Sequence, residues 1–72
     1  MRATLYVVSA CEHCARMRRD LESSEACYEV IDVGERREVV PELLKLTKGR
    51  RIVPVLVDDA GVHIAPHGGS AF

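Results

Sequence analysis

The sequence predicts a small α/β domain in which a pair of cysteines lies at the turn between the first strand and the first helix. Apolar runs rich in β-branched residues alternate with two amphipathic segments, in the order β-α-β-α-β-β. Cys11-Glu12-His13-Cys14 directly follows the first of these runs. A chain of 72 residues has room for one such domain, so we assign residues 1–72 to a single unit.

Composition and charge narrow the class of protein. The chain is 47% hydrophobic and 29% charged, as globular domains are, and its net charge of −1 gives no reason to expect nucleic acid or a membrane as a partner. The longest apolar run, residues 52–57, is too short to span a bilayer, and the N-terminus lacks a signal-peptide pattern. Three cysteines are an odd number, which suits a reactive intracellular pair better than a disulfide scaffold. We therefore expect a cytoplasmic protein that acts as a monomer.

The first strand and the first helix position the two cysteines. Residues 3–8 are rich in β-branched and aromatic side chains and predict a strand. Cys14, Met17 and Leu21 then follow at i, i+3 and i+7 and share one helical face, which we assign to the core. Because Cys11 precedes the regular helix, we expect it to project at the rim and to be exposed.

The remaining elements follow from the same two kinds of pattern, apolar β-branched runs for strands and helical spacing of apolar residues for helices. Poor helix formers at residues 23–25 should end the first helix, and residues 26–33 predict a second strand, parallel to the first because a helix connects them. A second helix should begin near residues 38–40, or be kinked at Pro41, and stop at Lys48-Gly49. Four segments complete the chain: a near-continuous buried strand at 52–57, a turn at 58–61, a partner strand at 62–65, and a tail at 66–72 without room for another helix.

The position of the cysteines indicates redox chemistry. The unpaired N–H groups and the dipole of a helix N-terminus favour a thiolate, and lowering a thiol pKa from about 8.5 to about 6 raises its ionised fraction at pH 7 from roughly 3% to roughly 90%. A protonated His13 would add to this effect, whereas Glu12 would oppose it from an exposed, screened position. We therefore predict a dithiol centre in which Cys11 is the nucleophile and Cys14 is the resolving thiol.

Three features, in this order along the chain, resemble the glutaredoxin family. They are Cys11-Glu12-His13-Cys14 after the first strand, Val53-Pro54 in the third strand, and Gly68-Gly69 after the fourth. Glu12-His13 is a variant of the family's usual Pro-Tyr. The resemblance implies a minimal thioredoxin fold: a four-stranded mixed sheet with helices packed on it, the final helix missing, and a cis peptide before Pro54. It also implies a thiol–disulfide oxidoreductase that reduces protein or glutathione mixed disulfides.

The resemblance further suggests how substrates and electron donors are held. The backbone of Val53, beside Pro54, would hydrogen-bond an extended thiol substrate, and Gly68 and Gly69 would hold glutathione. Arg51 precedes the turn at Val53-Pro54 and is placed to bind a carboxylate group of the substrate. We expect no tightly bound cofactor. The reductant would be glutathione or, if the chain is a small glutaredoxin-like electron donor, a flavin-dependent reductase of the thioredoxin-reductase type.

A Cys-x-x-Cys pair is also half of a zinc site, so the alternative function is a non-catalytic metal-binding or carrier module that uses the same cysteines. The other candidate ligands, Cys27, His63 and His67, are distant in the sequence, and we predict no metal site. We interpret Cys27 as a partly buried strand residue and the two histidines as surface or turn residues.

Overall fold

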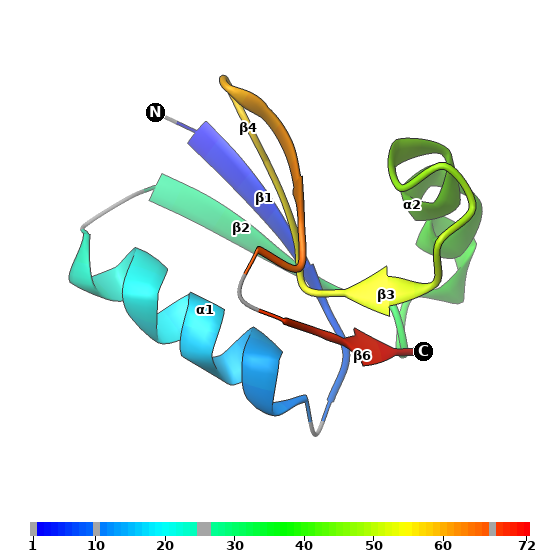
Figure 1. Cartoon of the computed structure of the whole chain (residues 1–72), viewed down its shortest axis with the longest axis horizontal. Coiled ribbons are helices and arrows are strands. Elements are labelled where there is room, and N and C mark those ends of the chain that lie inside the picture. Colours follow the sequence, from blue (N-terminus) through cyan, green and yellow to red (C-terminus); the bar gives the residue numbers. More distant parts are fainter. Residues whose placement is uncertain (1, 10, 25–26, 67) are drawn as a thin grey trace.

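The computed structural model describes residues 2–9, 11–24, 27–66 and 68–72. Its helices and strands follow the predicted order, with a 3₁₀ turn before the second helix and a short last strand in addition. The elements are β1 (Arg2–Val7), α1 (Glu12–Ser23), β2 (Cys27–Asp32), η1 (Arg37–Val39), α2 (Val40–Leu46), β3 (Ile52–Val53), β4 (Val55–Asp58), β5 (Gly61–Ile64) and β6 (Ser70–Ala71). α1 and α2 lie on opposite sides of the sheet (Figure 1). The predicted α/β class and minimal thioredoxin-like fold are confirmed.

The main sheet has four strands in the order β2-β1-β4-β5. β1 pairs with β2 in parallel, from Arg2 opposite Cys27 to Val7 opposite Asp32, and antiparallel with β4, which in turn pairs with β5. The mixed sheet and the parallel pairing of the first two strands are therefore as predicted. Because parallel strands end at the same edge, Val7 and Asp32 both lie at the edge from which the chain enters α1.

The core is formed between the sheet and the helices. Leu5 of β1 and Leu43 of α2 are both 0% exposed. Cys14 is the buried residue of α1, and the half-buried Met17 and Leu21 pack against the core beside it. The helical face that the sequence assigns to the core is therefore the face that α1 turns toward the sheet.

The second helix is entered through proline and left through a left-handed turn. The 3₁₀ turn η1 leads into α2 at Val40, and Pro41 occupies the first helical turn, where its missing N–H costs no hydrogen bond. The predicted start near residues 38–40 is therefore confirmed. After the helix, Lys48 and Gly49 have positive φ values of 58° and 87°, which ends it where the sequence indicates.

One prediction about the second half of the chain is wrong. The strand expected over residues 52–57 is divided at Pro54, which has no N–H to donate to a ladder, so that β3 lies outside the main sheet and only β4 belongs to it. The tail contains a strand that was not predicted, because β6 pairs antiparallel with β3 to form a second, two-stranded sheet. The cis peptide expected between Val53 and Pro54 is present. Ala26, where the second strand was expected to begin, lies outside the described residues.

The hairpin between β4 and β5 contains a carboxylate whose protonation should weaken the fold. Asp58 Oδ1 accepts hydrogen bonds from the backbone N–H groups of Ala60 and Gly61, at 2.8 and 3.1 Å, and lies 3.1 Å from His63 Nε2. Burial acts to raise the pKa of Asp58, but His63 and the two amides outweigh it, so the pKa is lowered. His63, interpreted from the sequence as an ordinary surface or turn residue, is a half-buried partner of this carboxylate.

We expect acid to cost the wild-type chain more stability than it costs the Asp58→Asn variant. A carboxylate whose pKa is lowered by folding stabilises the fold above its unfolded pKa, about 3.9, and this contribution is lost as the pH falls through the lower, folded value. Urea denaturation at neutral pH and below about pH 4 measures the difference. Asp59→Asn, a change at the neighbouring exposed aspartate, is the matched control. Equal acid sensitivity of all three proteins would show that Asp58 contributes nothing.

Candidate active site

Cys11 and Cys14 form the N-terminal turn of α1. Cys11 is the N-cap residue, with extended backbone angles, and its Sγ accepts a hydrogen bond from the backbone N–H of Cys14 at 3.2 Å. Its carbonyl oxygen accepts from the N–H of Ala15 and begins the helical hydrogen-bond pattern. The Cys11 sulfur therefore takes the place of a capping hydroxyl or carboxylate and lies at the positive end of the helix.

The expected exposure of Cys11 is wrong. Its side chain is only 7% exposed, against 2% for Cys14. Cys11 does lie at the rim of the helix, but β6 covers that rim, and Ser70 Oγ lies 3.8 Å from Cys11 Sγ, close enough to accept a hydrogen bond from the thiol. The burial comes from a segment about sixty positions away in the sequence, and helical periodicity contains no information about it.

The environment separates the acidities of the two thiols. Burial acts to raise the pKa of Cys11, but the thiolate accepts hydrogen bonds from Cys14, from the backbone of His13 and from the Ser70 hydroxyl, which donates once the thiol has lost its proton; together these outweigh burial, so the pKa is lowered. The pKa of Cys14 is raised to about 12, chiefly by burial and then by its hydrogen bond to Cys11, with a smaller effect from the negative charge of Asp32. One thiol is therefore prepared to ionise and the other to stay protonated.

A groove of about 440 Å³ gives the dithiol its contact with solvent. Both cysteines line it, together with Glu12, Arg18 and Asp32. Asp32 ends β2, accepts a hydrogen bond from Ser9 Oγ at 3.1 Å, and was not predicted as a site residue. The sequence does contain a sign of this role. Asp32 ends a strand that is parallel to β1, so it lies at the end of the sheet where the chain leaves β1 for Cys11.

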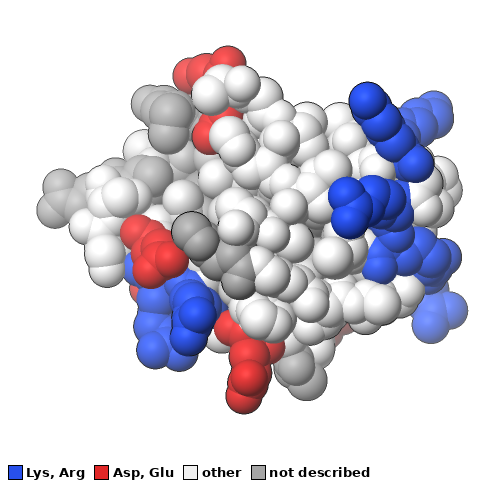
Figure 2. Space-filling model, in the orientation of Figure 1, with Lys and Arg blue, Asp and Glu red and all other residues white. Residues whose placement is uncertain are grey.

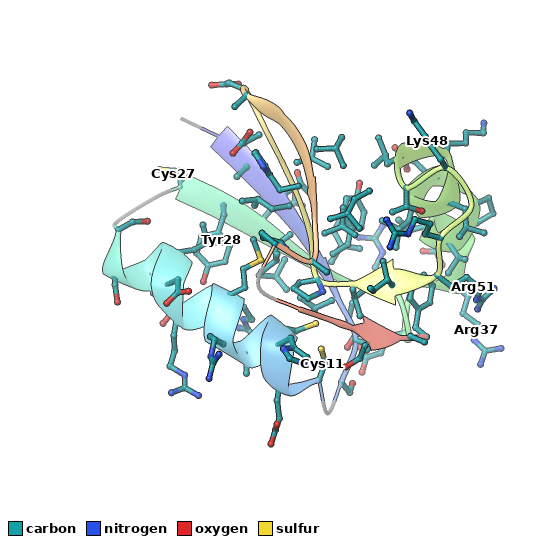
Figure 3. The ribbon with its side chains drawn as sticks, viewed as in Figure 1. Cys11, Cys27, Tyr28, Arg37, Lys48 and Arg51 are labelled. Atoms are coloured by element: carbon teal, nitrogen blue, oxygen red, sulfur yellow. The ribbon has the colours of Figure 1, made fainter. Side chains whose placement is uncertain are left out.

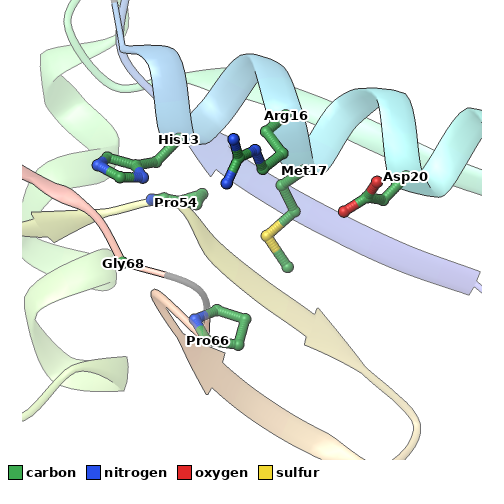
Figure 4. Close-up of a pocket in the computed structure, with 7 residues that line it drawn as sticks. All are labelled: His13, Arg16, Met17, Asp20, Pro54, Pro66 and Gly68. Atoms are coloured by element: carbon green, nitrogen blue, oxygen red, sulfur yellow. The ribbon is translucent and has the colours of Figure 1, made fainter.

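The other predicted site residues, apart from Arg51, lie beside the dithiol. Val53 is fully buried and its backbone is paired with Ser70 of β6. Gly68 lies against the imidazole of His13, since a Cβ added to Gly68 would lie 3.2 Å from His13 Cε1. His13, Pro54 and Gly68 line a crevice with about 10 Å³ of free volume, room for one water molecule at most (Figure 4). The ring of His13 thus faces this crevice, and it is the backbone of His13 that lowers the pKa of Cys11.

Arg51 is set apart from the dithiol and contacts the last residue of the chain. Its Nε donates to the carbonyl oxygen of Phe72 at 2.8 Å, and its guanidinium lies 5.0 Å from the centre of the Phe72 ring. Arg51 and Arg37 line a second groove, of about 450 Å³, which meets the first at Val8. The two arginines lie side by side in Figure 3, and Figure 2 shows lysine and arginine side chains gathered on this side of the molecule, over α2 and β3.

Cys27 lies away from the dithiol. It starts β2, opposite Arg2, at the end of the strand farthest from Asp32, and Figure 3 shows it well separated from Cys11. The expectation of a partly buried residue is wrong: Cys27 is exposed, because β2 is the edge strand of the sheet. His67 lies outside the described residues. Within the described part of the chain, no group of three or more histidine, cysteine or acidic side chains is placed to hold a metal ion.

A thioredoxin-like fold with a Cys-x-x-Cys pair at the start of its first helix defines the class of small thiol–disulfide redox proteins. Within that class, residues 3–64 match the glutaredoxin family model, and the chain belongs to the glutaredoxin family. Membership of this family indicates a thiol–disulfide redox role. No curated protein matches the chain. No helix in the described residues is long and apolar enough to cross a membrane.

Proposed function

We propose that this protein is a cytoplasmic, monomeric oxidoreductase that reduces protein or glutathione mixed disulfides by a dithiol mechanism. The observation that carries the proposal is the opposite shift of the two thiol pKa values, lowered for Cys11 and raised to about 12 for Cys14. A nucleophile has to be ionised at rest, whereas a resolving thiol is needed only after the first step. Two thiolates in contact would also repel each other, so one thiol must stay protonated.

The reaction transfers two electrons from the dithiol to the substrate. The Cys11 thiolate attacks one sulfur of the substrate disulfide, whose S–S bond breaks, and the departing thiolate takes up a proton. Cys14 then passes its proton to water in the groove that Asp32 lines, and its sulfur attacks Cys11 Sγ, which breaks the S–S bond between Cys11 and the substrate. The second substrate thiol leaves, and an oxidised Cys11–Cys14 disulfide remains.

The surrounding residues supply binding and electrostatics in this proposal. The backbone of Val53 pairs with an extended substrate, Pro54 shapes the turn, and Gly68 and Gly69 allow close approach at the same place. Arg51 meets a substrate carboxylate in the neighbouring groove, and the backbone of His13 helps to stabilise the Cys11 thiolate. Glutathione or a thioredoxin-reductase-type donor returns the two electrons, and no tightly bound cofactor takes part.

Two coupled assays test this function and identify the donor. Reduction of a glutathione mixed disulfide is followed by NADPH consumption, either with glutathione and its reductase or with thioredoxin reductase. We expect catalytic turnover with one of the two donors, because the Cys11–Cys14 disulfide has to be reduced before the next cycle. Fully reduced protein that transfers no electrons to the disulfide, even in a single turnover, would contradict the proposed function.

A further inference from the structure

The C-terminal strap, which we define as residues 70–72, occupies the edge of β3. Ser70 pairs antiparallel with Val53, and Ala71 pairs with Ile52. This is the same main-chain edge that an extended substrate would use under the proposed function, since a peptide adds to an exposed strand through backbone hydrogen bonds. The strap lies beyond residues 3–64, the part of the chain that matches the family.

The strap fits this edge closely because two glycines bring it there. A Cβ added to Gly69 would overlap the carbonyl oxygen of Val53 and lie 2.8 Å from Ala65 Cβ. Gly68 has a φ of +100° and rests on the ring of His13. A chain with side chains at these two positions could not approach β3 in the same way.

Ser70 stands where the sulfur of a substrate would stand. Its Oγ is 3.8 Å from Cys11 Sγ, and serine has the shape of cysteine with oxygen in place of sulfur. Serine cannot form a disulfide, so the strap fills the position opposite the nucleophile without reacting. With the strap in place only 7% of Cys11 is exposed: the strap closes the β3 side of the sulfur, and the groove that both cysteines line is its remaining contact with solvent.

Only two residues of the strap pair with β3, and Phe72 is its one residue that packs against the core, so the strap is able to open. Beyond the two-residue pairing with β3, its end is fixed by Arg51, whose carbonyl oxygen accepts the N–H of Phe72 at 3.3 Å. The side chain of Arg51 completes this attachment through its hydrogen bond to Phe72 and its position over the ring. Short edge strands with few buried contacts are the segments that open most readily in a native protein.

We propose that the C-terminal strap is an internal pseudosubstrate, which must leave the β3 edge before an extended, cysteine-containing peptide binds there. This inference rests on the proposed function. The strap also defines the peptide it imitates: glycine immediately before the cysteine, and an aromatic residue two positions after it for Arg51 to cover. The substrate class is therefore a Gly-Cys-x-aromatic segment in an extended conformation.

Alkylation of Cys11 by iodoacetamide tests the strap without any enzymatic turnover. The rate is measured against pH in a Cys14→Ser, Cys27→Ser background, so that the plateau at high pH reports access and the midpoint reports the thiol pKa. Phe72→Ala and Arg51→Ala should each raise the plateau about two- to fivefold, the change in open population expected from losing one cation–π contact. Arg50→Ala, which removes the same charge from the adjacent exposed position, should leave the plateau unchanged.

Ser70→Ala separates hydrogen bonding from access. It keeps the backbone pairing of β6 but removes the hydroxyl, so the midpoint should move to higher pH while the plateau stays that of the background protein. Unchanged far-UV circular dichroism verifies that each variant folds. If Phe72→Ala and Arg51→Ala give the plateau of Arg50→Ala, the strap is not a gate and the proposal is overturned. Because alkylation needs no substrate, that result is independent of whether the protein reduces disulfides.

The peptide preference is tested with two mixed disulfides of identical composition. Glutathione is joined to the cysteine of Gly-Gly-Cys-Ala-Phe or of the reversed sequence Phe-Ala-Cys-Gly-Gly. We expect the first to be reduced about two- to fivefold faster by the Phe72→Ala variant, and the preference to disappear when Arg51→Ala is added. Equal rates for the two peptides would overturn the assigned substrate class, whereas no reduction of either would instead contradict the proposed function.

Discussion

The Cys11→Ser variant should show no disulfide reduction above the uncatalysed rate. The thiolate is the attacking species, and Cys11 is the only thiol that the fold holds at the helix N-terminus with a lowered pKa among the described residues. Cys14 cannot take its place, because burial and its neighbours keep it protonated. The change is structurally mild, since a serine hydroxyl is also a good N-cap acceptor for the Cys14 amide. The measurement is single-turnover reduction of a glutathione mixed disulfide.

Cys14→Ser and Cys27→Ser complete this comparison. Without Cys14 the first step still occurs, so the substrate should remain attached to Cys11 as a mixed disulfide, which is detected by intact mass. Cys27 is exposed at the far end of β2, and its replacement should leave the rate unchanged. Full activity of Cys11→Ser, or loss of activity in Cys27→Ser, would show that the nucleophile has been assigned to the wrong residue.

The sequence predicts those parts of the fold that depend on local pattern. Three features are each decided within a few residues, and the structure agrees with all of them: the β-branched and aromatic run of β1, the helical spacing of Cys14, Met17 and Leu21, and the helix stop at Lys48-Gly49. The parallel pairing of β1 and β2 follows because a helix connects the two strands. These features alone place a cysteine pair at a helix N-terminus.

The features that the sequence does not predict depend on contacts between distant segments. Ser70 and Ala71 have no hydrophobic alternation and form a strand only because β3 is there to pair with them. β3 is available because the chain joins the main sheet only after Pro54, whereas the apolar pattern continues unbroken through that residue. The contact between Ser70 and Cys11 follows from both, so the unpredicted strand in the tail also led to the wrong expectation of an exposed Cys11.

The placement of the strap bears on the chemistry as well as on access. The Ser70 hydroxyl that covers Cys11 also contributes to lowering its pKa, so the contact that closes the site prepares the nucleophile. A thiolate that is stabilised and covered on its β3 side is closed to extended partners at that edge until a peptide displaces the strap. When the strap leaves, a substrate in the same position has to replace its hydrogen bond or accept a higher thiol pKa.

We expect the thiols of this protein to be alkylated at very different rates, with Cys14 the slowest. At pH 7 a thiol with a pKa of about 12 is ionised to about one part in 10⁵, against roughly 3% for an ordinary cysteine with a pKa near 8.5. Cys14 should therefore be alkylated on the order of a thousandfold more slowly than the exposed Cys27, which serves as a reference within the same molecule. Peptide mapping after timed iodoacetamide treatment of the reduced protein measures each site separately.

The pH dependence of these rates distinguishes acidity from simple burial. The Cys11 rate should reach its plateau below the pH expected for an ordinary thiol, because its pKa is lowered, while the Cys14 rate should still be rising at pH 10. In Cys11→Ser the Cys14 midpoint should move down but stay above 8.5, since the effect of Cys11 is removed and the burial remains. A Cys14 rate that levels off near pH 8.5 would mean that burial and the neighbouring Cys11 do not raise the pKa of Cys14. Both thiols could then ionise at rest, and the assignment of nucleophile and resolving thiol would lose its physical basis.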